Sequence, residues 1–453
     1  MLVDLKPSSV LSSVTNNVNN TEEISLSHIS SKGMRGRDIV IVNPYCDGGG
    51  DEALAKKIAN IALDEGCRVT INSFDARNKK DNSPGNYKSY SLQNDEPHSV
   101  SQLNNPLFII TPVSIVSTEH LNIHLGNLCE KYGFPKKDVI LIEEMDILLS
   151  QCRMAKHYES MLREIGFTNI TNSQLGFSEG AIGYIPTDEK TINEITKRFE
   201  NELCKLIDSY NMSLARDSSY HLGYISSDCY ISGTQAFIVN TLSETVADER
   251  SANFIMSLRL LEPKTEQIIV NQITDILMLK NEQYDYRSLF SKASVIVINS
   301  DSGNIEEYKK ITGEGTKEIK IILTDKLPKN IYDDFLLLAE TGMTSGDQSL
   351  SDYLTLKGKL PYYDMQPWKY PLVQSLKNLA GDELKTYLEQ KVTGRMPFSR
   401  EIVSSLMKKD NQPTLTPEQL IKKNDLDKKI SSKIATPYIK ALIRSAGQVY
   451  EAV

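Results

Sequence analysis

The chain has 453 residues, of which 40% are hydrophobic and 24% charged, the balance of an ordinary soluble globular protein. Its length favours two domains over one. The formal net charge of −8 argues against general nucleic-acid binding, which needs a basic surface. The sequence contains no apolar run of the roughly 18–20 residues that a membrane-spanning helix requires, and no signal peptide. We therefore expect a soluble or cytoplasmic protein with no integral membrane segment, and leave signal-less export open.

The cysteines are widely scattered. There are six of them, and no two form a CxxC pair. A disulfide framework or a zinc site is therefore not expected, and reduced thiols are the default.

The first domain is expected over residues 37–215, after a flexible leader at 1–36 that is rich in Ser, Asn and Thr. It opens with an apolar run at 38–43, typical of a buried parallel strand, which leads into a glycine-rich loop. A helix over about 51–65 and a strand at 68–74 follow. This strand, loop, helix and strand predict a doubly wound sheet. The remaining expected elements of this domain are a polar surface excursion over 76–105, strands at 107–111 and 138–143, and a charged helix over about 187–210.

The second domain is expected over residues 216–390, where a similar set of apolar runs recurs. Its expected strands lie at 220–226, 254–258, 294–299 and 318–324, and its expected helices at about 332–339 and 371–391. Residues 391–453 are Lys-rich and helical in pattern, and form a helical tail or an accessory lobe.

A loop of small residues at 344–349 feeds directly into a predicted helix, and a short buried strand follows that helix. The start of a helix exposes unpaired N–H groups and carries a partial positive charge. Gly346 lets a ligand approach the backbone, and Ser345 and Ser349 add hydroxyl donors. The loop is therefore a candidate seat for a diphosphate. The alternative is a helix capped by Ser345 or Ser349 that binds no ligand.

This arrangement, with a glycine-rich loop early in one α/β domain and a phosphate-type loop late in another, resembles the GT-B class of nucleotide-sugar glycosyltransferases. In motif layout the chain is similar to bacterial protein glycosyltransferases of the arginine-rhamnosylating kind. These have an Asp-x-x-Gly-Asp type loop after the first strand, and a Gly-acid-x-Ser loop before a helix and an apolar "GKP" strand. The corresponding segments here are Asp47-Gly-Gly-Gly-Asp51, Gly346-Asp-Gln-Ser349 and Lys357-Gly-Lys-Leu-Pro361. Gln348 takes the second acidic position.

The resemblance covers about 37–390 and implies an α/β fold of two Rossmann-like domains that face each other across a cleft. It implies that a nucleotide-sugar donor binds in the second domain as co-substrate, with no further cofactor. The acceptor, by analogy a protein, would bind in the first domain. The resemblance also implies inversion at the anomeric carbon. With no convincing metal motif, transfer without a metal ion is preferred.

Two carboxylates flank the first loop, at the carboxyl edge of the predicted sheet where ligands bind in open α/β folds. An inverting transfer needs a base that takes a proton from the acceptor. Asp47 is the first candidate because it lies within the loop, and Asp51 is the second, with the role of helix N-cap as its alternative. For both residues, turn chemistry is the structural alternative. Gly48, Gly49 and Gly50 form the acceptor-side loop.

On the donor side, Ser345, Gln348 and Ser349 are the candidate diphosphate contacts. Asp347 would repel a diphosphate, so it is expected to face ribose, sugar or a backbone amide. The resemblance also points to Tyr363 and Lys369 as donor-binding residues, beside Trp368, which either joins the site or anchors the loop to the core.

Two further patterns are weak. His120 and His124 are spaced as a metal pair on a helix, but without a third ligand they are interpreted as surface or core histidines. Asp425-Leu-Asp427 matches the metal motif of a different glycosyltransferase class. It lies in the Lys-rich tail with no strand before it, so it is interpreted as a solvated helix face. No metal site is expected.

Three rival functions remain. Val42-Asn-Pro44 followed by glycines is similar to the opening of diacylglycerol-kinase-like proteins, but the Gly-Gly-Asp-Gly motif of such a lipid or sugar kinase is absent from the sequence. A nicotinamide oxidoreductase is weaker, because no GxGxxG follows a strand. The chain could also be a non-catalytic GT-B-like binding or scaffold protein.

Overall fold

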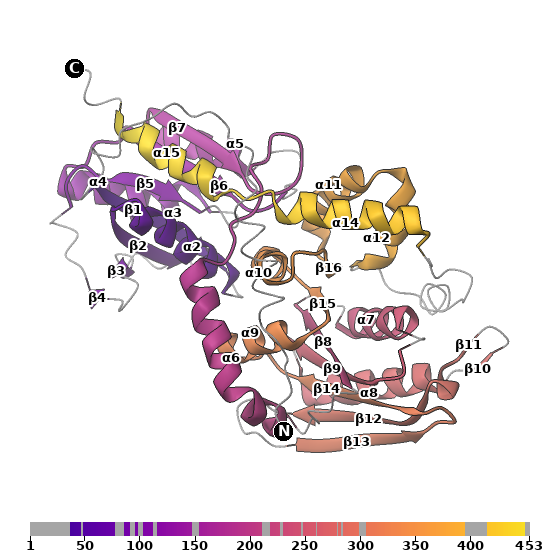
Figure 1. Cartoon of the computed structure of the whole chain (residues 1–453). Helices are drawn as coiled ribbons and strands as arrows, with labels where there is room; N and C mark the ends of the chain where they lie inside the picture. Colours follow the sequence, from indigo (N-terminus) through magenta and orange to yellow (C-terminus); the bar gives the residue numbers. More distant parts are fainter. Residues whose placement is uncertain are drawn as a thin grey trace. The chain divides into compact units, whose positions relative to one another are not determined.

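The computed structural model describes residues 37–46, 49–77, 86–90, 96–97, 103–111, 116–146, 154–210, 218–226, 230–245, 248–259, 261–278, 280–281, 284–298, 305–394 and 415–448. The expected leader at 1–36 lies outside these residues. The described residues form two compact units. The first unit contains the described residues of Val18–Asp188, Trp368–Leu376 and Ser432–Val453, and the second unit contains those of Glu189–Pro367 and Lys377–Ser431. Each unit is built on a mainly parallel sheet with helices, which confirms the predicted α/β fold class (Figure 1).

The sheet of the first unit has seven strands in the order β4-β3-β2-β1-β5-β6-β7. Their bounds are β1 (Asp38–Tyr45), β2 (Arg68–Asp75), β3 (Asn86–Tyr90), β4 (Glu96–Pro97), β5 (Leu107–Ile110), β6 (Asp138–Glu143) and β7 (Asn169–Gln174). β1 pairs in parallel with both β2 and β5, so the winding of the sheet reverses beside β1. β3 pairs antiparallel with β2 and lies in the polar segment that the sequence pattern marks as a surface excursion.

The helices of the first unit follow the predicted pattern of alternation with strands. They are α2 (Gly50–Asp64), α3 (Thr118–Leu121), the π-helical turn η3 (Asn122–Gly126), α4 (Asn127–Tyr132), α5 (Met154–Ile165) and α15 (Thr436–Gln448), with a 3-10 turn η5 (Pro367–Lys369) that leads into α11 (Tyr370–Ala380). The last of these, α11, continues into the second unit. The core of the first unit includes Val40 and Val42 of β1 and Phe108 of β5, all fully buried.

The two histidines four residues apart belong to this core. His120 and His124 are each 2% exposed, and the ring of Phe74 stacks on His124 with a centroid distance of 3.9 Å. The core interpretation is therefore confirmed over the surface one. Across the part of the chain that the structure describes, no group of three or more His, Cys, Asp or Glu side chains is placed to hold a metal ion.

The sheet of the second unit has eight strands in the order β13-β12-β14-β9-β8-β15-β16-β17. Their bounds are β8 (Ser218–Ile225), β9 (Ser251–Leu258), β12 (Phe290–Ile298), β13 (Ile305–Thr312), β14 (Lys317–Thr324), β15 (Thr341–Thr344), β16 (Tyr362–Met365) and β17 (Val392–Gly394). β8, the first of these strands in the chain, lies between β9 and β15 and is parallel to both. The winding therefore reverses between β8 and β15, and this pair marks the topological switch point of the sheet.

Helices cover both faces of this sheet (Figure 1). They are α6 (Glu189–Ser209), α7 (Tyr230–Glu244), α8 (Pro263–Leu277), α9 (Lys329–Leu338), α10 (Asp347–Lys357), α12 (Lys385–Lys391) and α14 (Pro417–Ser431), with 3-10 turns η4 (Tyr286–Ser288) and η6 (Asp382–Leu384) and a small hairpin of β10 (Lys280–Asn281) and β11 (Tyr284–Asp285). The single helix expected over 371–391 is wrong, because Gly381, at φ 71°, ends α11 and separates it from α12. Helix α6 lies within the range expected for the first domain but belongs to the second unit.

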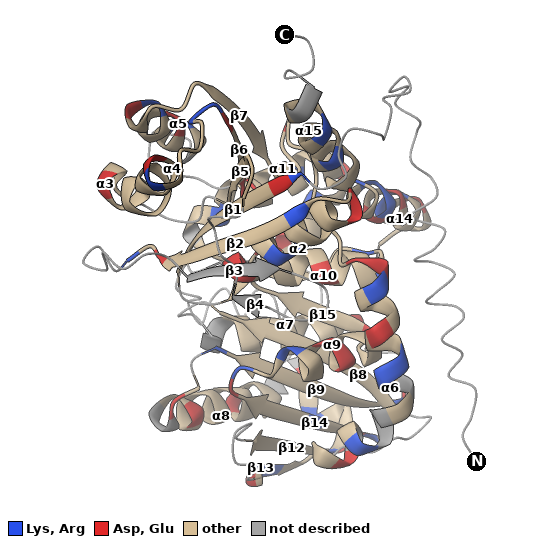
Figure 2. Ribbon diagram, turned by 90° about the vertical axis from the view of Figure 1, so that its left-hand side faces the viewer, with Lys and Arg blue, Asp and Glu red and all other residues tan. Residues whose placement is uncertain are grey.

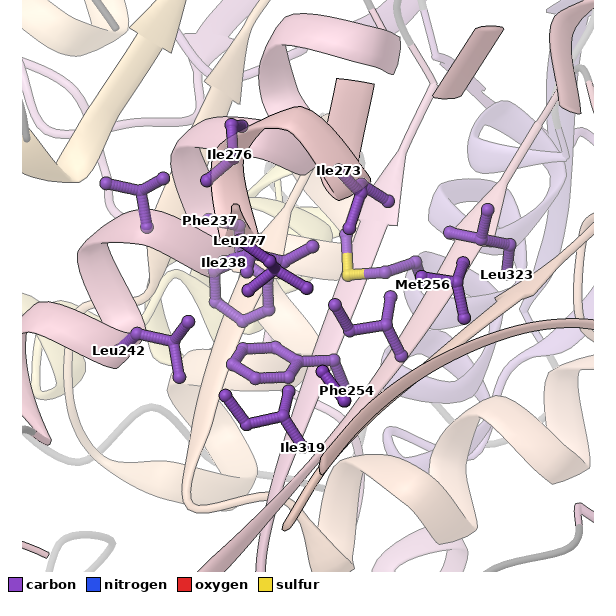
Figure 3. Packing of buried hydrophobic residues seen from close by; sticks show 14 of the residues in the cluster. Phe237, Ile238, Leu242, Phe254, Met256, Ile273, Ile276, Leu277, Ile319 and Leu323 are labelled. Carbon is purple, nitrogen blue, oxygen red and sulfur yellow. The ribbon is translucent and has the colours of Figure 1, made fainter. Parts of the chain in front are cut away.

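On one face, α7 and α8 pack on the strands through large apolar side chains (Figure 3). Phe237 of α7 meets Phe254 of β9 edge to face, with ring centroids 6.1 Å apart. Ile273 and Leu277 of α8 lie in the same cluster (Figure 3). Burial of such side chains is the main stabilising contribution to a sheet covered in this way.

On the other face, α6 carries lysines and acidic residues along its length (Figure 2). Its Arg198 turns toward the protein and forms an ion pair with Asp334 of α9, with 2.8 Å between Nη2 and Oδ1. Asp334 is buried, so this pair fixes α6 against α9. No helix within the described ranges is long and apolar enough to span a membrane.

The C-terminal tail contributes one helix to each unit. In the second unit, Asp427 of α14 is 6% exposed and accepts a hydrogen bond from the backbone N–H of Leu360 at 2.8 Å. Lys423 donates to its other oxygen at 2.9 Å. The interpretation of Asp425 and Asp427 as a solvated face is therefore wrong for Asp427, because a contact distant in sequence buries it, whereas Asp425 is exposed. In the first unit, Arg444 of α15 pairs with Glu65 at 2.6 Å.

We predict that Asp427→Ala lowers the free energy of unfolding by about 1–3 kcal/mol, because it leaves the buried Leu360 N–H without its acceptor. The matched control is Asp425→Ala, two residues away on the same helix, which should change stability by no more than about 0.5 kcal/mol. Urea denaturation measures both. Equal effects of the two substitutions would contradict a structural role specific to Asp427.

A second prediction concerns His221 of β8, which is fully buried between Ser219 and Thr341. Its Nε2 lies 3.0 Å from Ser219 Oγ and its Nδ1 lies 2.8 Å from Thr341 Oγ1, which links β8 to β15. Burial, assisted by the charge of Arg250, lowers the pKa of His221 to about 3. In the unfolded chain a histidine titrates near pH 6.5.

Between pH 6.5 and about 3 the unfolded chain therefore binds a proton at His221 that the native chain does not. The free energy of unfolding should fall as pH falls through this window, by up to about 1.4 kcal/mol per pH unit from this group. His221→Gln should flatten that dependence relative to the unsubstituted chain. Parallel pH profiles for the unsubstituted chain and the His221 variant would refute the assignment.

Candidate functional site

Polar residues gather where β8, β15 and β16 of the second unit end. Ser226 follows β8, Ser345 follows β15, and Asp364 lies near the end of β16. Because the three strands are parallel, these residues share the carboxyl edge of the sheet. This edge includes the switch point between β8 and β15, where open α/β sheets bind their ligands.

A chain of hydrogen bonds joins four side chains at this edge. Gln366 Nε2 donates to Ser226 Oγ at 2.9 Å, and the hydroxyls of Ser226 and Ser345 lie 2.7 Å apart. Ser345 Oγ donates to Asp364 Oδ2 at 3.1 Å. All four residues are buried, with Asp364 only 1% exposed. The chain ties the ends of three strands together in the interior.

Helix α10 begins at the same edge, immediately after Gly346. Gly346 has φ 87° and ψ 171°, a conformation that is essentially restricted to glycine. A Cβ built on it would meet no atom of the described chain within 4 Å, so the space beside it is open. This geometry lets another molecule approach the backbone where α10 starts.

The first turn of α10 has no side-chain cap. Ser345 directs its hydroxyl to Asp364, and Ser349 donates to the carbonyl oxygens of Ser345 and Gly346 at 2.8 and 3.2 Å. The alternative of a helix capped by one of these serines is therefore wrong. As at any helix start, the first N–H groups of α10 have no acceptor within the helix itself.

Two more predicted donor-side residues lie in this first turn. Asp347 is 9% exposed. Gln348 is half-buried, and its Oε1 atom is enclosed with no hydrogen-bond partner among the described residues. An enclosed amide oxygen without a donor costs about 1–3 kcal/mol, so this atom is suited to accept from a ligand hydroxyl.

The other two predicted donor residues lie in different surroundings. Tyr363 of β16 is 1% exposed, within the sheet layer of the second unit. Lys369 belongs to the first unit, where its Nζ donates to Glu144 Oε2 at 3.0 Å and to the Met145 carbonyl at 3.1 Å. The structure thus brings Ser345 to Ser349 together and places Lys369 in a separate cluster. The neighbouring Trp368 is 39% exposed.

The glycine-rich loop of the first unit follows β1. Asp47 and Gly48 lie outside the described residues. Gly49, at φ 74°, is the N-cap of α2, and Gly50 is its first residue, so the N-cap role considered for Asp51 is wrong. Asp51 instead accepts the backbone N–H of Cys46 at 2.8 Å, which closes the loop on itself.

Acidic groups also gather at this edge of the first sheet. Tyr158 of α5 is fully buried, and its hydroxyl pKa is raised mainly by burial and further by Cys46, Asp51 and Glu144. Glu144 directly follows β6. The loop after β1 and the end of β6 therefore both influence the Tyr158 hydroxyl, and Lys369 pairs with Glu144.

The sequence interpretation missed Ser226, Gln366, Asp364 and Glu144. Ser226, Gln366 and Glu144 directly follow buried strands, and Asp364 lies one residue before the end of its strand. That position is itself a usable signal, because the carboxyl ends of parallel strands meet at one edge. The pairing of β8 with β15, which brings Ser226 to Ser345, is not visible in the sequence.

No protein-family model and no curated protein matches the sequence. Among solved structures the chain is similar to the trehalose-6-phosphate synthase OtsA, with 9% identity, 91% of this chain and 99% of that chain covered, and a TM-score of 0.44. It is also similar to a UDP-forming alpha,alpha-trehalose-phosphate synthase from Burkholderia xenovorans, with 8% identity, coverage of 92% and 100%, and a TM-score of 0.45. An E. coli trehalose-6-phosphate structure bound with UDP-2-fluoro glucose gives 9% identity, coverage of 91% and 99%, and a TM-score of 0.43. These similarities identify neither a substrate nor a reaction for this chain.

Proposed function

We propose that this protein is a nucleotide-sugar glycosyltransferase whose second unit holds the donor diphosphate at the start of α10. The observation that carries the proposal is the helix start after Gly346, which has no side-chain cap and adjoins open space at the switch point of a parallel sheet. The backbone N–H groups of a helix start and the positive end of the helix dipole favour an anion there.

The environment of α10 favours a donor with hydroxyl groups over a bare phosphate. Gln348 Oε1 lacks a hydrogen-bond donor among the described residues, and a ribose or sugar hydroxyl of the ligand would supply that hydrogen bond. Asp347 lies in the same turn, and because its carboxylate would repel the phosphates, we expect it to face a ribose or sugar hydroxyl or a backbone amide. The two residues together suit a ligand with a diphosphate at one end and hydroxyls at the other.

For the acceptor side we propose Asp47 as the base that takes the proton from the acceptor. Asp51, the second candidate, already accepts the Cys46 N–H, and withdrawing its carboxylate would open the loop. The resemblance in motif layout supports a protein acceptor and inversion, without a metal ion. The rival scaffold function shares the fold and the donor site, and differs only in lacking turnover.

The donor site is tested by a thermal-shift screen of the unsubstituted chain against UDP-, GDP-, dTDP-, CMP- and ADP-sugars. We expect one nucleotide to stabilise the fold selectively, by about 2.7 kcal/mol at a hundred times its Kd. Gly346→Trp should abolish the shift by filling the open space, and Gln348→Ala should weaken binding about tenfold, the equivalent of one hydrogen bond. Asp425→Ala, on exposed surface, is the control. If folded protein responds to none of the five nucleotides, the scaffold function replaces the proposal.

The base is tested on the donor that the screen identifies. Asp47→Asn should lower the turnover number by a factor of about 10²–10⁴, the usual contribution of a general base, with the Kd for the donor unchanged. Donor hydrolysis or transfer to the acceptor measures turnover, and analysis of the product anomer tests inversion. Full turnover in the Asn variant would exclude Asp47, and a retained anomer would exclude inversion.

A further inference from the structure

The four-residue hydrogen-bond chain at the switch point has a direction. Ser345 uses its one hydroxyl hydrogen on Asp364, so the short contact between the two serines is donated by Ser226. Ser226 in turn accepts from Gln366. The three hydrogen bonds therefore run in one direction, from Gln366 through Ser226 and Ser345 to the carboxylate of Asp364. In such an order each hydrogen bond polarises the next.

The carboxylate at the end of this chain lies against a second helix. A Cβ built on Gly233, in the first turns of α7, would lie 3.6 Å from Asp364 Oδ1. Helix α7 is the helix that follows β8, and α10 is the helix that follows β15. The switch point thus brings together two helix beginnings, and the buried carboxylate lies between them, with Oδ1 near α7 and Oδ2 bonded to Ser345 before α10.

The same hydrogen bonds also hold Ser345 in place, just before the start of α10. Ser345 is 4% exposed and is held on one side by Ser226 and on the other by Asp364. Gly346 is the next residue, and its backbone conformation sets the direction of the first N–H groups of α10. Movement of Ser345 would therefore be transmitted directly to those groups.

We propose that Ser226 and Gln366 are positioning residues for the donor diphosphate, an inference that rests on the proposed function. They act on the diphosphate indirectly, by fixing Ser345, which precedes Gly346 and the first N–H groups of α10. Because Ser345 is held in place, the backbone N–H groups at the start of α10 have a fixed direction before the ligand binds. Preorganised N–H groups bind a ligand more tightly than mobile ones.

The test compares dissociation constants by calorimetry for two probes: the nucleoside diphosphate that binds the unsubstituted chain, chosen from UDP, GDP, dTDP, CDP and ADP, and inorganic pyrophosphate. Ser226→Ala removes the hydroxyl that holds Ser345, and should weaken both probes by the same factor, about tenfold. Ser226→Thr keeps the hydroxyl, so this variant should bind both probes with the affinity of the unsubstituted chain. Ser351→Ala is the matched control, a buried serine of α10 that donates to the Asp347 carbonyl and takes no part in the chain.

Gln366→Met provides a second variant of similar volume, in case Ser226→Ala does not fold. It removes the first donor of the chain and should weaken both probes in the same proportion. Unchanged affinity in folded Ser226→Ala or Gln366→Met protein would overturn the positioning role and leave the proposed function standing. Loss of affinity for the nucleotide alone, with pyrophosphate unaffected, would also overturn it. If the unsubstituted chain binds neither probe, the proposed function and this inference fail together.

Discussion

The parallel pairing of β8 with β15 is the constraint on which the polar architecture of the second unit depends. It places the residues that follow two strands, Ser226 and Ser345, within hydrogen-bonding distance although 119 positions separate them in sequence. It also makes α7 and α10 begin at one edge. His221, which bonds to Thr341 at the opposite end of β15, locks the same pair of strands. A shift of one residue in this register would turn these side chains to the other face of the sheet.

Burial gives the hydrogen bonds at this edge their importance. A polar group enclosed without a partner is strongly unfavourable, so each member of the chain from Gln366 to Asp364 depends on its neighbours. Gln348, in the first turn of α10, differs from these residues, because its enclosed amide oxygen has no hydrogen-bond partner among the described residues. A satisfied network beside an unsatisfied acceptor is the pattern expected when a rigid frame supports a site that a ligand completes.

Much of the fold could be predicted from the sequence, because buried parallel strands are continuous apolar runs. Strands β1, β2, β5 and β6 and helix α2 lie within a few residues of their expected positions. The small-residue loop before α10 was likewise evident from Gly346 and its neighbours. These features depend on local composition, which is what a sequence displays directly.

The features that could not be predicted depend on contacts between distant segments. β3 is a polar strand whose pairing with β2, rather than its own composition, makes it a strand. Asp427 looks solvated in its Lys-rich helix and is buried only because it binds the Leu360 backbone. Ser226 and Gln366 are ordinary polar residues until the sheet order brings them together. In the same way, only the folded chain shows that Lys369 pairs with Glu144.

The way the tail is shared between the units has a consequence for biosynthesis. The first unit includes α15, whose Arg444 bonds to Glu65, and the backbone of Tyr184 bonds to Lys433. Those partners are translated after nearly all of the second unit, so the first unit cannot be completed when its own N-terminal strands leave the ribosome. The second unit has the same dependence on α14. A stop codon or a proteolytic cut shortly before residue 417 would therefore leave both units incomplete, and neither unit can be exchanged between proteins as one continuous genetic cassette.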